Sequence, residues 1–440
     1  MARFSARLLW SGALALAALA GASRPARAED ASAPPAAPPR LRVEGVVDEV
    51  LNFEDLHDKP TDFLMNTLRT TLRASGTLSP HFEYKAGVVG RWNAGSLHVD
   101  NVPFLPPRLR ATVVPADPTT GSAGARPYLE NEIASDLYVQ EAYATLRLAR
   151  FYVRAGRQKI QSGTGYSFNP TDLFNRRVPL DPTYEADGFD AIATGARLSA
   201  DTEIQLLAAP RGGARYRARF QTVTRGTTLA LQFTSVPRGR VDWQEVNTPA
   251  TVAALDAGRA TVGDSERVFR WNQAAVEVTR PFRGGRAYAE VGYAFLDPPA
   301  DPGTLGPASK DHERILVGLD YTFASKLHVI AEYMRLGEGR PGGSLLTLND
   351  EQGFFKGETL SADQDNAYLE LAGPLPGRFS ASLKVLGMLD HPAVGLNPWL
   401  YFDPRPNVRF AASLYGYLGR AESTYSNVGL GAFAELRWTF

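Results

Sequence analysis

Three arginines at alternate positions form the densest group of like charges in the sequence. Arg215, Arg217 and Arg219 alternate with Tyr216, Ala218 and Phe220. Because successive side chains of a β-strand point to opposite faces, the three guanidinium groups would point the same way at intervals of ~7 Å. A row of this kind that lines an aqueous lumen attracts anions. The same row could instead form solvated ion pairs with carboxylates on neighbouring strands.

Other charged residues on the polar faces of alternating segments are expected to line the same lumen. The bases of this set are Arg69, Arg73, Lys85, Arg147 and Arg154. The acids of this set are Glu277, Glu290, Asp320, Glu332 and Glu370. Bases opposite acids would set a transverse field across a narrow lumen, unless the charges neutralise one another along the wall.

A third group of residues favours a compact loop between residues 161 and 188. The residues of this group are Gly163, Gly165, Asn169, Pro170 and Asp172, all of types that form tight turns. At this density of turn residues we expect the loop to be folded. The sequence leaves two positions open for it, either inside the lumen as a constriction or on the surface.

Signatures of catalysis and of cofactor binding are absent from the sequence. The chain has no Cys, which excludes disulfides, iron–sulfur clusters and thiol nucleophiles. It has no G-x-S-x-G motif, no glycine-rich phosphate loop followed by Lys, and no H-E-x-x-H motif. The six His residues are scattered singly, without the spacing of metal ligands. We therefore expect no catalytic residue, no cofactor and no metal site.

The elements that would position these charges are long strands with strict alternation. From Ile315 to Phe323 every second residue is apolar or aromatic, while Arg314, Asp320 and Thr322 lie on the other face. Such segments run to ten or more residues, longer than the roughly five or six of most strands in soluble sheets. The predicted segments are 41–53, 62–75, 79–92, 135–148, 150–160, 189–199, 203–209, 215–223, 227–236, 266–280, 286–296, 312–323, 326–336, 365–373, 379–389, 395–402, 407–418 and 425–440.

The lengths of the connections favour one closed sheet. The long connections follow odd-numbered segments, and the short ones follow even-numbered segments. Bacterial outer-membrane barrels have this alternation of long outer loops and short periplasmic turns. The sequence therefore predicts an all-β fold, a closed antiparallel transmembrane β-barrel of about 18 strands over residues 41–440. A count of about 16 stays an alternative, because the segments 203–209 and 395–402 are weak.

The residues that precede this barrel are expected to have other roles. Arg3 and Arg7 precede an apolar stretch that ends in a small-residue cleavage site before Glu29. We predict that residues 1–28 are a cleaved signal peptide and that residues 29–40 are a linker rich in Pro and Ala. The chain has 47 Lys and Arg residues against 47 Asp and Glu residues, so its charge gives no reason to expect nucleic acid as a partner.

Motifs in the first half of the chain resemble a known class of membrane proteins. They are Val139-Gln140-Glu141-Ala142-Tyr143, Gly156-Arg157-Gln158-Lys159-Ile160 and Asn169-Pro170-Thr171-Asp172. This pattern resembles the strand, the GRQ strand end and the NP-x-D loop of Gram-negative outer-membrane barrels, the alginate-export-like and porin-like families of about eighteen strands. The resemblance implies a barrel in the outer membrane but no particular cargo. Gln161 and Ser162 depart from the pattern, because many relatives have a Trp before the Gly.

The C-terminal strand resembles the same class. Trp438 and Phe440 end its apolar face, and Phe440 resembles the terminal aromatic residue that the barrel-assembly machinery recognises. The resemblance implies three partners, which are this machinery, outer-membrane lipid and lipopolysaccharide. Nothing in the sequence predicts the oligomeric state.

Three functions are compatible with these expectations. The first is an outer-membrane channel for the passive passage of small hydrophilic solutes, anions among them, or for the export of a polymer. The second is a barrel with a closed lumen whose long loops bind a partner. The third is an outer-membrane enzyme that hydrolyses lipid with His81 or His328 as base, although both residues fall on the polar face and such an enzyme needs a base that faces lipid.

Overall fold

The computed structural model describes most of the predicted barrel. The described residues are 41–54, 63–175, 186, 188–297, 310–420, 422–424 and 429–440. The predicted signal peptide and linker, residues 1–28 and 29–40, lie outside the described residues, as does part of the predicted loop 161–188.

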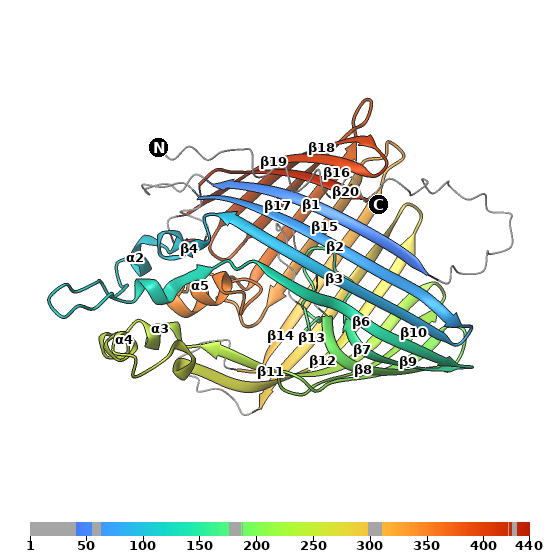
Figure 1. The fold of residues 1–440 in the computed structure, drawn as a ribbon, viewed down its shortest axis with the longest axis horizontal. Coiled ribbons are helices and arrows are strands. Elements are labelled where there is room, and N and C mark those ends of the chain that lie inside the picture. Colours follow the sequence, from blue (N-terminus) through green and yellow to red (C-terminus); the bar gives the residue numbers. More distant parts are fainter. Residues whose placement is uncertain are drawn as a thin grey trace.

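Eighteen strands form one closed antiparallel sheet (Figure 1). Each strand pairs with its neighbours in chain order, and β1 closes the sheet by pairing with β20. The predicted fold is therefore confirmed, and both weak segments are strands of the barrel. The barrel strands are β1 (Arg42–Glu54), β2 (Phe63–Ser79), β3 (Phe82–Gly95), β6 (Asp136–Leu148), β7 (Phe151–Lys159), β8 (Gly188–Arg197), β9 (Thr202–Ala209), β10 (Arg215–Thr224), β11 (Thr227–Val241), β12 (Glu266–Phe282), β13 (Gly285–Asp297), β14 (His312–Thr322), β15 (His328–Leu336), β16 (Asp365–Pro374), β17 (Phe379–Met388), β18 (Ala393–Arg405), β19 (Val408–Gly419) and β20 (Gly431–Thr439).

The two faces of each strand differ in burial as the alternation predicts. In β10, Arg217 is 7% exposed on the inner face, whereas Tyr216 is 48% exposed on the outer face. In β14, Leu316 is fully buried and Val317 is 54% exposed. An apolar outer surface of this kind fits the hydrocarbon core of a membrane, and a polar inner surface fits a lumen.

Several strand boundaries differ from the prediction by a few residues, among them the end of β18 and the start of β20, and local reasons explain two of the differences. The predicted strand 79–92 begins three residues early, because β2 continues to Ser79 and the turn forms at Pro80 and His81. The predicted strand 227–236 ends early, because β11 continues through Pro237 and Gly239 to Val241. Proline and glycine favour the end of a strand, but the paired strand β12 holds this segment in the sheet.

Helices and a small hairpin lie together at the end of the barrel with the long connections, which we call the outer end (Figure 1). None of the helices in the described part of the chain is long and apolar enough to cross a membrane. These elements are β4 (His98–Asp100), η1 (Val102–Phe104), α2 (Pro107–Arg110), η2 (Arg126–Leu129), β5 (Glu130–Glu132), α3 (Trp243–Val246), α4 (Pro249–Asp256), η3 (Val262–Ser265) and α5 (Leu348–Phe355).

The three helical connections share a hydrophobic core and together form a cap. Leu105 and Leu129 from the first connection pack with Trp243 and Val246 from the second and Leu348 from the third. A capping box starts α5. The Thr347 hydroxyl accepts a hydrogen bond from the backbone N–H of Asp350, and the Asp350 carboxylate accepts one from the backbone N–H of Thr347. The cap was not predicted, because its helices are short and their apolar residues are few.

Candidate functional site

The segment of residues 160–175, which we call the inner segment, lies inside the barrel. Thr171 is fully buried, and Leu173 and Phe168 are 2% and 5% exposed. Leu173 belongs to a hydrophobic cluster with inner-face residues of β8, β9, β11, β12 and β13, and Phe168 to a second cluster on β13–β18. Of the two positions left open by the sequence, the described part of the loop therefore takes the one inside the lumen.

Three inner-wall carboxylates bind backbone N–H groups of the inner segment. Glu290 on β13 accepts hydrogen bonds from Gly165 N at 2.8 Å and from the backbone and hydroxyl of Thr171 at 3.3 and 2.6 Å. The other two carboxylates bind in the same way. Glu332 accepts bonds from the backbones of Ser167 and Phe168, both at 2.9 Å, and Glu277 accepts one from the backbone of Gly163 at 3.1 Å. Successive N–H groups that converge in this way form a binding concavity for an anion.

The two predicted glycines permit this tight path. Gly163 has a φ of 82°, which side chains other than glycine rarely adopt. A Cβ atom at Gly165 would lie 1.9 Å from the carbonyl oxygen of Phe168. The glycines are therefore required for the backbone to present its N–H groups to Glu290 and Glu332.

Carbonyl groups of the inner segment are bound by donors from the same wall. Arg314 donates to the carbonyl of Pro170 at 3.0 Å, and Arg238 donates to the carbonyl of Leu173 at 3.1 Å. Arg217 donates to the carbonyl of Gln161 at 2.9 Å. The wall thus satisfies both donors and acceptors of a buried loop, which would otherwise lose its hydrogen bonds with water.

Asn169 and Asp172 stabilise the inner segment from within. The Asn169 amide donates to the carbonyl of Ser162 at 2.5 Å. The Asp172 carboxylate accepts hydrogen bonds from the backbone N–H groups of Phe174 and Asn175 at 3.0 and 3.2 Å. All five residues predicted for a constriction loop therefore lie in one folded segment.

The predicted row of arginines faces inward but is largely occupied. Arg219 forms a bidentate ion pair with Glu277 at 2.8 Å. Arg217 also donates to the side chain of Gln205 at 2.5 Å. Arg215 lies over the ring of Phe189 at 4.9 Å and has no ion-pair partner among the described residues. Arg217 thus binds the inner segment directly, and Arg219 binds Glu277, a carboxylate that itself binds the inner segment.

The predicted acids on the inner wall are also engaged, as in the alternative in which the charges neutralise one another along the wall. Besides the three carboxylates that bind the inner segment, Asp320 pairs with Arg286 at 3.1 Å. Glu370 accepts a hydrogen bond from the hydroxyl of Tyr368 at 2.8 Å. Tyr368 lies two positions from Glu370 on the same strand, whereas Arg286 comes from the strand next to that of Asp320.

The bases on β2, β3, β6 and β7 line a different part of the wall. Three of them form ion pairs, Arg69 with Asp48 at 2.7 Å, Lys85 with Glu141 at 2.9 Å and Arg147 with Glu83 at 2.8 Å. Two others bind neutral groups. Arg73 donates to Gln140 at 3.5 Å, and Arg154 donates to Thr145 at 3.0 Å and lies over the ring of Tyr143 at 4.8 Å.

The exposed charges on the inner wall lie near the short turns, at the end of the barrel opposite the cap. The side chains of Lys85, Arg147 and Arg286 are 33%, 45% and 39% exposed. By contrast, Glu277 and Glu290 are at most 1% exposed, and Gln140 and Thr145 on β6 are fully buried. The wall is therefore covered in its middle, on β6 as well as beside the inner segment, and open toward the short turns.

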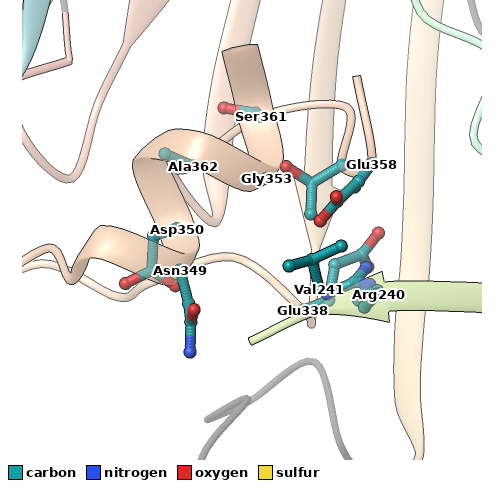
Figure 2. A pocket seen from close by; sticks show the side chains of 10 residues that line it. Arg240, Val241, Glu338, Asn349, Asp350, Gly353, Glu358, Ser361 and Ala362 are labelled. Atoms are coloured by element: carbon teal, nitrogen blue, oxygen red, sulfur yellow. The ribbon is translucent and has the colours of Figure 1, made fainter. Parts of the chain in front are cut away.

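A small polar pocket lies where β11 meets the connection that carries α5 (Figure 2). Its cavity of about 10 Å³ has the size of one water molecule. Arg240 points into it, is 5% exposed, and its Nη2 atom has no hydrogen-bond partner among the described residues. Arg240 was missed by the sequence analysis because the predicted strand ended before it.

Glu338 beside this pocket fixes the connection to the barrel rim. It pairs with Arg314 and lies 3.1 Å from His312 Nε2. Burial by itself raises the pKa of a carboxyl, but the charges of Arg314 and His312 hold the pKa of Glu338 well below its usual value. Glu338 is therefore a charged anchor between the cap and β14.

Two further contacts hold the cap to neighbouring connections. Glu351 on α5 is fully buried and accepts a hydrogen bond from the Thr424 hydroxyl at 3.1 Å, and burial raises its pKa to about 8. His391 lies 2.6 Å from both Asp363 Oδ1 and the carbonyl of Ser344. Burial lowers the pKa of His391, but these contacts raise it by more, so that its pKa lies above the usual value.

The structure also bears on the metal and lipid-hydrolysis alternatives. No group of three or more His, Asp or Glu side chains in the described ranges could hold a metal ion. His328, the base considered for lipid hydrolysis, lies on the inner face next to Thr322, with 2.9 Å between His328 Nδ1 and the hydroxyl.

The closed sheet, its apolar outer surface and the folded inner segment define a porin-like barrel of the Gram-negative outer-membrane type. Two solved structures resemble it in fold. Pseudomonas aeruginosa OccK9 (OpdG) has a TM-score of 0.52 at 10% sequence identity, over 91% of this chain and 98% of that one. Acinetobacter baumannii OccAB4 has a TM-score of 0.51 at 9% identity, over 92% and 98%. No protein-family model matches the sequence, and no curated protein matches it.

Proposed function

We propose that the protein is a passive outer-membrane channel for small hydrophilic solutes, with a preference for anions. The observation that carries this proposal is a group of charged side chains inside the barrel that stay exposed. The inner segment packs against the wall of β8–β15, whereas Lys85, Arg147 and Arg286 near the short turns keep a third to nearly half of their surface exposed. A route past these side chains would be narrow and lined by charge, as in a selective pore.

The preference for anions is argued from a base that forms no direct ion pair. Arg154 donates to Thr145 and lies over the ring of Tyr143, and it has no ion-pair partner among the described residues, although it lies close enough to Glu83 to interact with its charge. It lies on β7, next to the exposed pair of Arg147 and Glu83. A guanidinium group in a confined space with low-dielectric walls raises the local concentration of anions.

The test is the current through single channels of the purified full chain in a planar bilayer. We expect discrete conductance steps and, in a KCl gradient, a zero-current potential with the sign of an anion-preferring pore. Arg154→Glu should move this potential toward the cation side, and the effect should shrink at ~1 M salt, where the Debye length is ~3 Å. Arg259→Glu is the matched control, because Arg259 is exposed in the cap.

Other outcomes would contradict parts of the proposal. A channel that prefers cations, or an Arg154→Glu variant with unchanged selectivity, would show that this wall does not select. Neutral polymers of graded size would measure the width of the route, and free entry of large ones would favour the export of a polymer over the passage of small solutes.

A closed barrel that binds a partner is the second candidate, and one observation favours it. The cap has its own hydrophobic core and lies over the outer end of the barrel (Figure 1). A protein with correct folding and no conductance over a range of voltages would support this candidate and would contradict the channel.

A further inference from the structure

The outward faces of β10–β13 form an apolar groove in the lipid-facing surface. Ala218, Phe233, Ala274 and Tyr293 are successive cross-strand neighbours from β10 to β13. Two small, exposed side chains therefore alternate with two aromatic ones, so the surface is hollow on both sides of Phe233. This row and the next row toward the short turns line a groove of about 600 Å³. Sites that bind small molecules have volumes of ~300–1,000 Å³.

A polar row follows the groove toward the outer end of the same strands. Tyr216, Ser235 and Asn272 are cross-strand neighbours, two positions further along each strand than the groove residues. The Ser235 hydroxyl donates to Asn272 Oδ1 at 2.7 Å. A hydroxyl and an amide on the outward face are unfavourable against hydrocarbon, so this row belongs to the upper edge of the apolar band.

Arg270 lies one row beyond Asn272 on the outward face. Its guanidinium donates twice to the carbonyl of Ala214, at 2.7 and 3.0 Å, and lies 5.6 Å from the centre of the Tyr216 ring. Its cross-strand neighbour on β13 is Asp297, but Arg270 forms no ion pair with it or with any other described residue. Arg270 therefore offers a cationic group, held in place by Ala214, to an anionic ligand.

The spacing of these rows matches the layers of a membrane. At the opposite end of β12, the ring of Phe282 stacks on that of Tyr321 with 5.8 Å between the ring centres, as in an interfacial girdle. Asn272 and Phe282 are ten positions apart on β12. This separation is ~33 Å along a strand and ~25 Å along the membrane normal at a tilt of ~40°, which is about the height of the apolar band. Arg270 lies beyond this band, at the level of the lipid headgroups.

We propose that this part of the outer surface binds one phosphate-bearing lipid of the outer leaflet, with an acyl chain in the groove and a phosphate group on Arg270. An acyl chain gains little by leaving other lipid chains, so the groove fixes the position of the chain and the polar groups select the headgroup. Hydrogen bonds between a guanidinium and a phosphate are charge-assisted and strong. Ser235 and Asn272 lie between the two and face the linkage that joins chain and headgroup. The proposal does not depend on whether the lumen conducts.

The test measures the binding of lipid A, a phosphorylated lipid, to the purified full chain in detergent, with native mass spectrometry to count the lipids on each barrel. We expect one lipid A molecule to bind more tightly than any further one. Arg270→Gln should weaken its binding at least fivefold. Arg335→Gln is the matched control and should bind as the wild type does, because Arg335 lies near the outer end of β15 but is paired with Glu313 and Asp365.

A second substitution tests the groove without touching the charge. Ala274→Trp fills the groove and should also weaken the binding of lipid A at least fivefold, while the barrel keeps its heat-dependent shift on a gel. Ala412→Trp is its control, because Ala412 is an exposed alanine on β19, remote from β12 in the strand order.

Three outcomes would overturn the proposal. The first is equal binding by the wild type, Arg270→Gln and Ala274→Trp. The second is binding of phosphatidylethanolamine as tight as that of lipid A, because its own ammonium offsets the phosphate charge that Arg270 should select. The third is release of lipid A by inorganic phosphate, which would show that the site takes the free ion and not a lipid.

Discussion

Glutamates on the inner wall have a structural task that their residue type does not reveal. In an open pore, Glu290 and Glu332 would act as fixed charges for passing ions. Here each accepts several hydrogen bonds from the inner segment and is buried, Glu290 completely and Glu332 at 4% exposure. A buried carboxyl group that accepts several hydrogen bonds from one segment fixes the path of that segment, so these two side chains set the position of the inner segment.

We predict that Glu290→Ala loosens the inner segment. The substitution removes the acceptor of the backbone N–H groups of Thr164 and Thr171, and each unpaired buried donor costs about 1–3 kcal/mol. Hydrogen exchange of residues 160–175 should become faster. Glu83→Ala is the control, because its ion pair with Arg147 is about half exposed and contributes less than ~1 kcal/mol. Equal exchange in both variants would refute this role of Glu290.

The cap should respond to pH through Glu351. Burial raises the pKa of Glu351 to about 8, whereas an unfolded chain ionises this group near 4.5. Below pH ~4.5 the carboxyl is neutral in both states, so the folded state is not penalised. As the pH rises toward 8 the unfolded state loses its proton first, and the contact with Thr424 becomes less stable by up to ~5 kcal/mol.

Glu351→Gln tests this pH dependence. At pH 8, residues 337–364 should be better protected from protease in the variant than in the wild type. At pH 4, the two proteins should be protected equally. Glu422→Gln is the control, because Glu422 is a half-exposed partner of Arg108 in the neighbouring connection. A protection that does not depend on pH in the wild type would contradict the prediction.

At the scale of elements, the seam between β1 and β20 closes the sheet. Gly45 and Phe440 exchange two backbone hydrogen bonds at 2.8 and 2.9 Å, and the ring of Phe440 lies against Gly45. A Cβ atom at Gly45 would be 2.2 Å from the ring. Phe440, which resembles a terminal assembly signal, therefore also packs against Gly45 in the folded barrel.

Two variants separate assembly from the seam. Phe440→Ala should lower the amount of inserted barrel under high expression, because the expected assembly signal is lost. Gly45→Val should keep the signal but crowd the ring, which costs about 1–3 kcal/mol of barrel stability. The amounts of heat-modifiable barrel in the membrane and of aggregate in the periplasm measure both effects. Insertion of Phe440→Ala at the normal rate would exclude a role as a signal.

At the scale of the whole molecule, closure removes every free edge of the eighteen-stranded sheet. Each of its strands has two partners, and the register between neighbours is continuous apart from shifts in β2–β3, β3–β6 and β18–β19. A closed ladder resists detergent at room temperature, because no strand can leave without breaking hydrogen bonds on both sides.

We therefore predict that the protein fractionates with the outer membrane and migrates faster on detergent gels before boiling than after. The compact barrel binds less detergent than the unfolded chain. Recovery of the full-length protein as a soluble species without a heat-dependent shift would contradict both the compartment and the closed barrel.

The sequence by itself determined the barrel. Alternation in segments such as 312–323 and the parity of connection lengths are local signals, because each strand has to place one face in lipid and each hairpin has to return on the opposite side. They also placed Glu277, Glu290 and Glu332 on the inner wall, and they marked Gly163 and Gly165 as turn residues.

Only the tertiary structure decided what these residues bind. Glu290 meets Gly165 across 125 positions of sequence, and Glu332 meets Ser167 across 165. No local pattern encodes such a pair, because a carboxylate on a polar face can equally bind water, a base or a backbone N–H. In this barrel the carboxylates bind backbone N–H groups, because the backbone of a buried loop needs hydrogen-bond partners and the surrounding wall supplies them.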